Sequence, residues 1–129
     1  GILAIELFIT KDNKVIVNEL APRPHNSGHY TIEACSFDQF DAHIRGIAGW
    51  PLIQPKLLSP AVMVNVLGQH VAPTRALIAT HPEWNVHDYG KAEVRHDRKM
   101  GHITVLTDDT AKTVADLEAT GCWDDLKKA

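Results

Sequence analysis

Two glutamates with clear chemical potential lie in two short apolar runs near the beginning of the chain. Glu6 sits within ILAIELFI, and Glu19 sits within VIVNELA. The polar tetrapeptide KDNK, residues 11–14, separates the runs and has the composition of a hairpin loop. A loop of this length pairs Thr10 with Val15, and continuing the pairing predicts that Glu6 lies directly opposite Glu19 on one face of a hairpin.

Two carboxylates that face each other on a largely apolar surface require an explanation. Like charges directly opposite destabilise a β-ladder, and removing an unpaired charge from water costs more. A divalent cation between the carboxylates would offset both costs, and Mg²⁺ prefers such oxygen ligands together with substrate phosphates. We therefore predict a magnesium site with Glu6 and Glu19 as ligands. The alternative is a shifted register, or two glutamates at a solvated edge.

The loop after the second run, PRPHNSGHY, gathers an arginine, an amide and two histidines. Its two prolines fix the backbone and hold the loop away from helix, which suits groups that must be positioned. Arg23 offers a planar fork for carboxylate, bicarbonate or phosphate, and His25 can move protons near neutral pH. Zinc binding by His25 and His29 is disfavoured, because their spacing requires a helix that Pro24 and Gly28 oppose.

A second charged segment lies late in the sequence. Four cations fall within nine residues of a chain whose net charge is −3, namely Lys91, Arg95, Arg98 and Lys99. One interpretation is a receptor for the phosphate of a small anionic substrate, since cations form strong charge-assisted hydrogen bonds. The alternative is a solvated charged turn.

Composition limits the classes of protein to consider. The 129 residues are 44% apolar and 22% charged, as in one ordinary globular domain or part of one. The acidic net charge argues against a nucleic-acid partner, and no apolar run is long enough to span a membrane. Cys35 and Cys122 form neither a metal motif nor a disulfide framework, so we expect a reducing cytoplasm.

The remaining elements follow from caps, breakers and periodicity. Ser36 and Gln39 have capping-box spacing and predict a helix that ends at Gly49. Helical periodicity places Phe40, Ile44 and Ile47 toward the core. His43 and Arg45 are expected to lie toward solvent. Residues 50–60, which hold three prolines, form a connector. We expect strands within 61–68, 84–91 and 102–108, and helices within 74–81 and 108–121, the last with Val114 and Leu117 inward. Trp50, Trp84, Trp123 and Leu126 are predicted to pack.

The chain starts with Gly1, and a predicted strand follows at once. A two-stranded hairpin is marginal without further strands or a helix. We therefore expect a carboxy-terminal part of a longer protein.

The stretch GILAIELFITKDNKVIVNELAPRPHNSGHYTIEAC resembles the ATP-grasp superfamily. Together with YGK and RKMGHITV further on, the chain more narrowly resembles the 5-(carboxyamino)imidazole ribonucleotide synthases, the ATPase subunits of phosphoribosylaminoimidazole carboxylase. The resemblance implies an α+β fold. Residues 1–56 would complete an ATP-grasp domain with antiparallel strands and a helix, and residues 57–129 would form a small β-rich, barrel-sandwich-like domain.

The same resemblance implies a reaction and a set of roles. The family uses ATP, Mg²⁺ and bicarbonate to carboxylate aminoimidazole ribonucleotide through carboxyphosphate. The implied roles are metal binding by Glu6 and Glu19, ATP binding by Asn18 and Glu19, bicarbonate chemistry by Arg23, His25 and Asn26, and ribonucleotide 5′-phosphate binding by Lys91 and Arg98. Many ATP-grasp relatives have an asparagine two residues after the second glutamate, where this chain has Ala21.

Further expectations concern partners and alternatives. The resemblance implies a homodimer and a need for the amino-terminal part of the enzyme, so we expect the 129-residue chain alone to be inactive. Two other hypotheses stay open from the residues: a different carboxylating ATP-grasp ligase, such as a biotin carboxylase-like enzyme, and a non-catalytic module for folding or dimer contacts.

Overall fold

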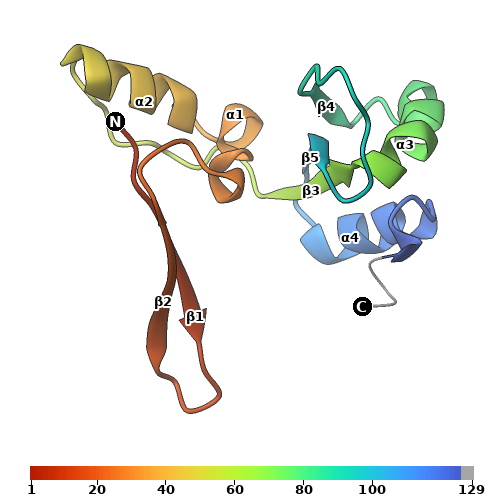
Figure 1. The fold of residues 1–129 in the computed structure, drawn as a ribbon, viewed down its shortest axis with the longest axis horizontal. Coiled ribbons are helices and arrows are strands. Elements are labelled where there is room, and N and C mark those ends of the chain that lie inside the picture. The colour runs from red at the N-terminus through yellow and green to blue at the C-terminus, as the bar shows by residue number, and fades with distance from the viewer. Residues whose placement is uncertain (126–129) are drawn as a thin grey trace. The chain divides into compact units, whose positions relative to one another are not determined.

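The computed structural model describes residues 1–125 and divides the chain into two compact units, Gly1–Leu58 and Ser59–Ala129. Both units combine helices with an antiparallel sheet, as expected for a mixed α and β protein (Figure 1). The first sheet has the strand order β1-β2, and the second has the order β3-β5-β4. No helix in the part of the chain that the structure describes is both long and apolar enough to cross a membrane.

The hairpin of the first unit consists of β1 (Ala4–Ile9) and β2 (Val15–Ala21). At its tip Ile9 pairs with Val15, so the predicted pairing of Thr10 with Val15 is wrong by one residue. Thr10 instead closes the turn, with its backbone N–H 2.9 Å from the carbonyl oxygen of Lys14. The turn is therefore one residue longer than the polar tetrapeptide indicated.

A β-bulge corrects this shift before it reaches the glutamates. Leu7 pairs with Val17, whereas Glu6 pairs with Glu19, so that Asn18 is the extra residue on β2. A bulge places two residues of one strand opposite a single residue of the other. The predicted pairing of the two glutamates is thus confirmed, although the register near the turn alone would have placed Asn18 opposite Glu6.

Three short helical elements follow the hairpin: η1 (Asn26–Gly28), α1 (Thr31–Ala34) and α2 (Gln39–Ala48). The predicted start of α2 at Ser36 is wrong, because Asp38 is the N-cap and accepts hydrogen bonds from the N–H groups of Phe40 and Asp41. Gly49 ends the helix as predicted, in the left-handed conformation with φ of 68°. The predicted capping residue Gln39 is buried and has another role.

The orientation predicted for α2 is also wrong. Phe40, Ile44 and Ile47 are 42%, 59% and 66% exposed, and the described residues leave this apolar face uncovered. The beginning of the chain contacts the helix beside this stripe, where His43 Nδ1 accepts a hydrogen bond from the Ile2 N–H at 3.1 Å. Periodicity identified the apolar stripe correctly, but it could not identify what the stripe contacts.

Residues 50–60 contain no helix or strand, as predicted for a connector. Leu57 forms an isolated antiparallel bridge with Cys35, which fastens the connector to the end of α1. Trp50 is 62% exposed, so the prediction that it packs is wrong.

The second unit has a three-stranded antiparallel sheet of β3 (Ala61–Leu67), β4 (Asn85–Asp88) and β5 (Lys99–Leu106), with β5 in the centre. Its helical elements are η2 (Gly68–His70), α3 (Val71–Leu77), η3 (Ile78–Thr80) and α4 (Thr110–Ala119). A barrel-sandwich form is not confirmed. In the described part of the chain β3 and β4 pair only with β5, and the sheet is not closed.

The core of the second unit contains the buried residues Val66, Trp84, Ile103, Val105, Leu117, Cys122 and Trp123. Trp123 also donates its indole N–H to the backbone oxygen of Asn65 at 2.9 Å. The predictions for Trp84, Trp123 and Leu117 are confirmed, whereas Val114 is 44% exposed and its predicted inward orientation is wrong. Leu126 lies outside the described residues.

Candidate active site

The bulge in β2 directs polar side chains toward Glu6. The amide nitrogen of Asn18 donates to Glu6 Oε2 at 3.0 Å, and Glu19 lies beside them as the direct strand partner of Glu6. The expected ATP-binding pair, Asn18 and Glu19, is therefore assembled around the other expected metal ligand. One backbone irregularity brings all three side chains together.

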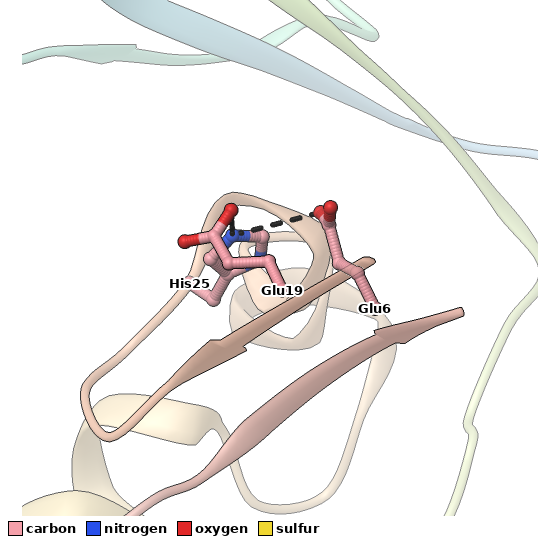
Figure 2. Close-up of side chains that lie close together, drawn as sticks. All are labelled: Glu6, Glu19 and His25. Atoms are coloured by element: carbon pink, nitrogen blue, oxygen red, sulfur yellow. Dashed lines mark ion pairs between the residues drawn. The ribbon is translucent and has the colours of Figure 1, made fainter. Parts of the chain in front are cut away.

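His25 is the third titratable group of the cluster. Its Nε2 lies 3.6 Å from Glu6 Oε1 and 3.8 Å from Glu19 Oε2 (Figure 2). One ligand atom from each of the three side chains lies within 4.8 Å of the others. The side chain of His25 is 11% exposed, whereas the glutamate side chains are 38% and 47% exposed. The two partly exposed carboxylates thus approach the same buried histidine from the solvent side.

The buried side chain of Gln39 fixes the loop that carries His25. Its Oε1 accepts from the His25 N–H and its Nε2 donates to the His25 carbonyl, both at 2.9 Å. Its Nε2 also lies 2.8 Å from His29 Nδ1. A Cβ on Gly28 would lie 2.5 Å from Gln39 Oε1, so a glycine is needed for this close approach. The loop is held by the first residue of α2 and by the two prolines.

The hydrogen bonds of His25 also indicate its tautomer. The backbone N–H of Ser27 donates to Nδ1 at 3.4 Å, and the Ser27 hydroxyl lies 2.9 Å from the same atom. Because an N–H can only donate, Nδ1 carries the lone pair, and the proton of the neutral imidazole belongs on Nε2. The face that His25 turns toward the carboxylates is therefore a hydrogen-bond donor.

This geometry indicates which residues fit a magnesium ion. Oxygen ligands about 2.1 Å from one Mg²⁺ lie at most about 4.2 Å apart. The ligand atoms of the cluster lie within 4.8 Å of one another, so a small side-chain movement would bring the two carboxylates into range. Glu6 and Glu19 supply carboxylate oxygens, the ligands Mg²⁺ prefers. His25 does not fit as a ligand, since binding through Nε2 would move the proton to Nδ1, where the Ser27 N–H already donates.

Two other predicted site residues lie in the same loop. Arg23 is 61% exposed, and its Nη2 lies 3.7 Å from Glu19 Oε1. Asn26 begins η1, and its Oδ1 is buried without a hydrogen-bond partner among the described residues. Arg23, His25 and Asn26 thus offer an exposed cation, an imidazole N–H and an unused amide acceptor within four residues.

The basic segment of the second unit forms the loop between β4 and β5 and the start of β5. The guanidinium of Arg95 is paired with Glu93, and Lys99 has become the first residue of β5. Neither Lys91 nor Arg98 has an ion-pair partner among residues 1–125, and Arg98 is exposed. Lys91 and Arg98, the two cations expected to bind a phosphate, therefore keep a charge that no carboxylate of the described residues neutralises, as does Lys99.

A cavity of about 140 Å³ adjoins Lys91. Its lining is mostly apolar, with Arg75 and Asp88 among the polar residues. Their ion pair measures 2.8 Å. A hydrogen bond from the Gly90 N–H and, after it, the bond from Arg75 hold the pKa of Asp88 below its usual value.

Sequence reasoning did not identify Gln39 as part of this site. Its spacing from Ser36 suggested a helix cap, and no local pattern indicates that a glutamine will bind a backbone segment 14 residues away. Ala21 is buried, and the methyl group of an alanine offers no ligand atom beside the carboxylates.

Comparison with known families defines the class of these residues. Residues 1–40, which contain the whole carboxylate cluster, match the ATP-grasp domain. Residues 61–116, which contain the basic segment, match the phosphoribosylaminoimidazole carboxylase C-terminal domain. The first 40 residues of the chain are thus similar to part of an ATP-grasp domain.

More particularly, the chain is similar to N5-carboxyaminoimidazole ribonucleotide synthases. It is 54% identical to the enzyme of Staphylococcus saprophyticus over 114 residues, which cover 88% of this chain and 30% of the relative. The resemblance seen in the sequence is therefore confirmed. The chain spans about 30% of the length of the curated relatives it matches.

Solved structures agree with this assignment. The Staphylococcus aureus synthetase complexed with ADP is 50% identical, with a TM-score of 0.86 over 90% of this chain and 31% of its own. The Aspergillus clavatus synthase in complex with ADP and 5-aminoimidazole ribonucleotide is 33% identical, with a TM-score of 0.79 over 90% of this chain and 33% of its own.

Proposed function

We propose that the chain is the carboxy-terminal part of an ATP-dependent ligase that carboxylates 5-aminoimidazole ribonucleotide to the N5-carboxyamino product in purine biosynthesis. The observation that carries the proposal is the convergence of Glu6, Glu19 and His25 within residues that match an ATP-grasp domain. The relatives crystallised with ADP and with 5-aminoimidazole ribonucleotide support the choice of substrates.

The chemistry has two steps. A bicarbonate oxygen attacks the γ-phosphorus of ATP and forms carboxyphosphate as ADP leaves. The exocyclic amine of the ribonucleotide then attacks the carboxyl carbon, inorganic phosphate leaves, and the amine loses a proton. Glu6 and Glu19 would hold Mg²⁺, which supplies charge neutralisation for the phosphate groups of ATP. Asn18 orients Glu6 through its hydrogen bond of 3.0 Å.

The loop after β2 suits the bicarbonate end of the reaction. Arg23 offers its guanidinium to the anion, and the His25 Nε2–H is a second donor. Asn26 adds a carboxamide oxygen that is buried in this conformation and has no hydrogen-bond partner among the described residues. Donors placed in advance around a developing anion stabilise it without reorganisation at the moment of reaction.

In the second unit, Lys91 and Arg98 would hold the 5′-phosphate of the ribonucleotide. Their charge is available because the described residues provide no carboxylate partner for either of them. In this proposal residues 1–56 belong to the ATP-grasp domain and residues 57–129 to the small carboxy-terminal domain. The enzyme would act in the cytoplasm as a homodimer that includes the remaining amino-terminal part.

The test uses an enzyme of the relatives' length that ends in this sequence. We expect ADP release that requires both bicarbonate and 5-aminoimidazole ribonucleotide, and no such release from the purified 129-residue chain. ADP release driven by biotin instead of the ribonucleotide would favour a biotin carboxylase-like ligase. A tight dimer that releases no ADP and whose size ignores Mg-ADP would favour a non-catalytic module.

A further inference from the structure

The short helix η2 contains a glutamine that joins three distant segments of the second unit. Gln69 Nε2 donates to Asp97 Oδ1 at 3.0 Å and to Asp125 Oδ2 at 2.9 Å. Gln69 Oε1 accepts from the backbone N–H of Asp97 at 2.9 Å. Every polar atom of the carboxamide is therefore used, and two of the three bonds hold a single residue of the basic segment.

Asp97 has a backbone conformation that needs support from its surroundings. Its φ is 59°, in the left-handed region that non-glycine residues rarely adopt. It directly precedes Arg98, whose N–H bonds back to the Arg95 carbonyl at 3.2 Å. The Gln69 carboxamide thus fixes the unusual turn from which the Arg98 side chain emerges.

Gly68 brings η2 against the same turn. A Cβ at this position would lie 1.9 Å from the carbonyl oxygen of Arg95, so only glycine permits the approach. The basic segment therefore rests on the backbone of η2 in addition to its bonds with Gln69.

Residues Gln69 and His70 of η2 also bond to Asp125, the last residue that the structure describes. His70 is 1% exposed, and its Nδ1 accepts from the Leu67 N–H at 3.2 Å. Its Nε2 therefore carries the proton and donates to Asp125 Oδ1 at 2.8 Å. Asp125 also accepts a hydrogen bond from Gln69. The carboxamide of Gln69 is therefore fixed by Asp125 while it bonds to Asp97.

We propose that Gln69 is a positioning residue that holds Arg98 ready for the 5′-phosphate of the substrate. The inference rests on the proposed function, since that function assigns the phosphate to Lys91 and Arg98. Neither cation is tied down by a carboxylate, so without this support the loop would have to be ordered when the phosphate binds. Ordering a flexible loop costs binding free energy, and fixing it beforehand recovers that cost.

The experiment measures binding of ribose 5-phosphate to the 129-residue chain by NMR titration. We expect Gln69→Ala to weaken binding about tenfold, by the preorganisation argument, while Arg98→Ala abolishes it. Gln54→Ala is the matched control, because Gln54 is exposed and lies outside the second unit, and we expect no change.

Hydrogen exchange separates positioning from general destabilisation. In Gln69→Ala we expect faster exchange for the amides of residues 93–98 and unchanged exchange in the central strand β5. If Gln69→Ala does not fold, Asp97→Gly provides the same test, because glycine accepts the left-handed backbone and only the carboxylate is lost. We expect it to weaken binding severalfold, as one of the two bonds to Gln69 remains.

The outcomes are distinguishable. Equal affinity of the parent chain and Gln69→Ala, with binding abolished by Arg98→Ala, would overturn the inference and leave the proposed function standing. Absence of ribose 5-phosphate binding by the parent chain, or binding indifferent to Arg98→Ala, would refute the phosphate site of the proposed function and the inference with it.

Discussion

The carboxylate cluster of the first unit and the basic segment of the second unit carry opposite charges, but a glutamine side chain positions each of them. The first stands on two paired strands and has a buried histidine wall. The second is an exposed loop between two strands. In each, a glutamine distant in sequence holds both the N–H and an oxygen of one loop residue: Gln39 holds His25, and Gln69 holds Asp97.

The difference between the two glutamines is burial. The Gln39 side chain is buried and bonds only to groups of the folded loop, so its loss would leave the His25 backbone N–H without a partner away from water. The His25 carbonyl would keep its hydrogen bond from the Gly28 N–H at 2.9 Å. Gln69 is partly accessible, and water can replace some of its bonds. We therefore expect Gln39 to contribute mainly to the stability of the fold. Gln69 should contribute mainly to the preorganisation of the loop that binds phosphate.

The largest expected effect tests the carboxylate cluster itself. In an enzyme of the relatives' length, Glu19→Ala should lower ribonucleotide-dependent ADP release by at least about 10²-fold, because charge stabilisation worth several kcal/mol is lost with the metal. Glu83→Ala, at an exposed glutamate of the second unit, is the control and should leave the rate unchanged. A rate for Glu19→Ala within a factor of two of the parent would remove the proposed metal site.

The next effect tests the burial of Gln39. Gln39→Ala should destabilise the first unit by about 1–3 kcal/mol, since the buried backbone N–H of His25 loses its partner. The measurement is urea unfolding followed by an NMR signal of the first unit, with Gln54→Ala as the matched control. A loss below about 0.5 kcal/mol would mean that water satisfies the loop and that the two glutamines do not differ as argued.

A smaller effect tests whether ion pairing separates the cations of the basic segment. Arg98→Ala should abolish measurable ribose 5-phosphate binding, a loss of more than about tenfold, because a charge-assisted hydrogen bond is lost. Arg95→Ala should change binding by less than about twofold, because its guanidinium is paired with Glu93. Equal losses in the two variants would show that the crowding of charge, and not the pairing, decides affinity.

The smallest effect concerns pH. Hydrogen bonds from Gln69 and then from His70 hold the pKa of Asp125 below its ordinary value of 3.8. A lowered pKa in the folded state gives a stabilising contribution that is present above the unfolded value and lost as the pH falls through the folded value. Between about pH 6 and about pH 3, the parent chain should therefore lose more stability than Asp125→Asn.

Urea midpoints at both pH values provide the measurement. Asp108→Asn is the control, because Asp108 is exposed and has no hydrogen bond from its side chain among the described residues. Its midpoint should follow that of the parent chain. If Asp125→Asn also follows the parent chain at both pH values, Asp125 does not couple η2 to the end of the described chain.

The elements were largely predictable from sequence, and the contacts between them were not. Strands β3 and β4 and helix α4 were found within the predicted ranges, because each has a clear hydrophobic pattern bounded by glycine, proline or a cap. Strand β5 begins at Lys99, three residues before its predicted range, because ladder pairing with β3 continues into the charged segment. The inward orientation of Phe40, Ile44 and Ile47 failed, since a pattern shows which face is apolar and not what lies against it.

The sequence by itself determined the hairpin and the concentration of cations around Arg98, because these features depend on residues that are close along the chain. The predicted pairing of Glu6 with Glu19 is correct only because the bulge offsets a turn that is one residue longer than predicted. Only the tertiary structure decided that a bulge at Asn18 produces that pairing, that His25 turns its Nε2 toward the carboxylates, and that Gln39 and Gln69 hold the two loops. Such contacts join residues 14 and 28 positions apart, and no local energy term selects them. They form only when packing has brought the segments together.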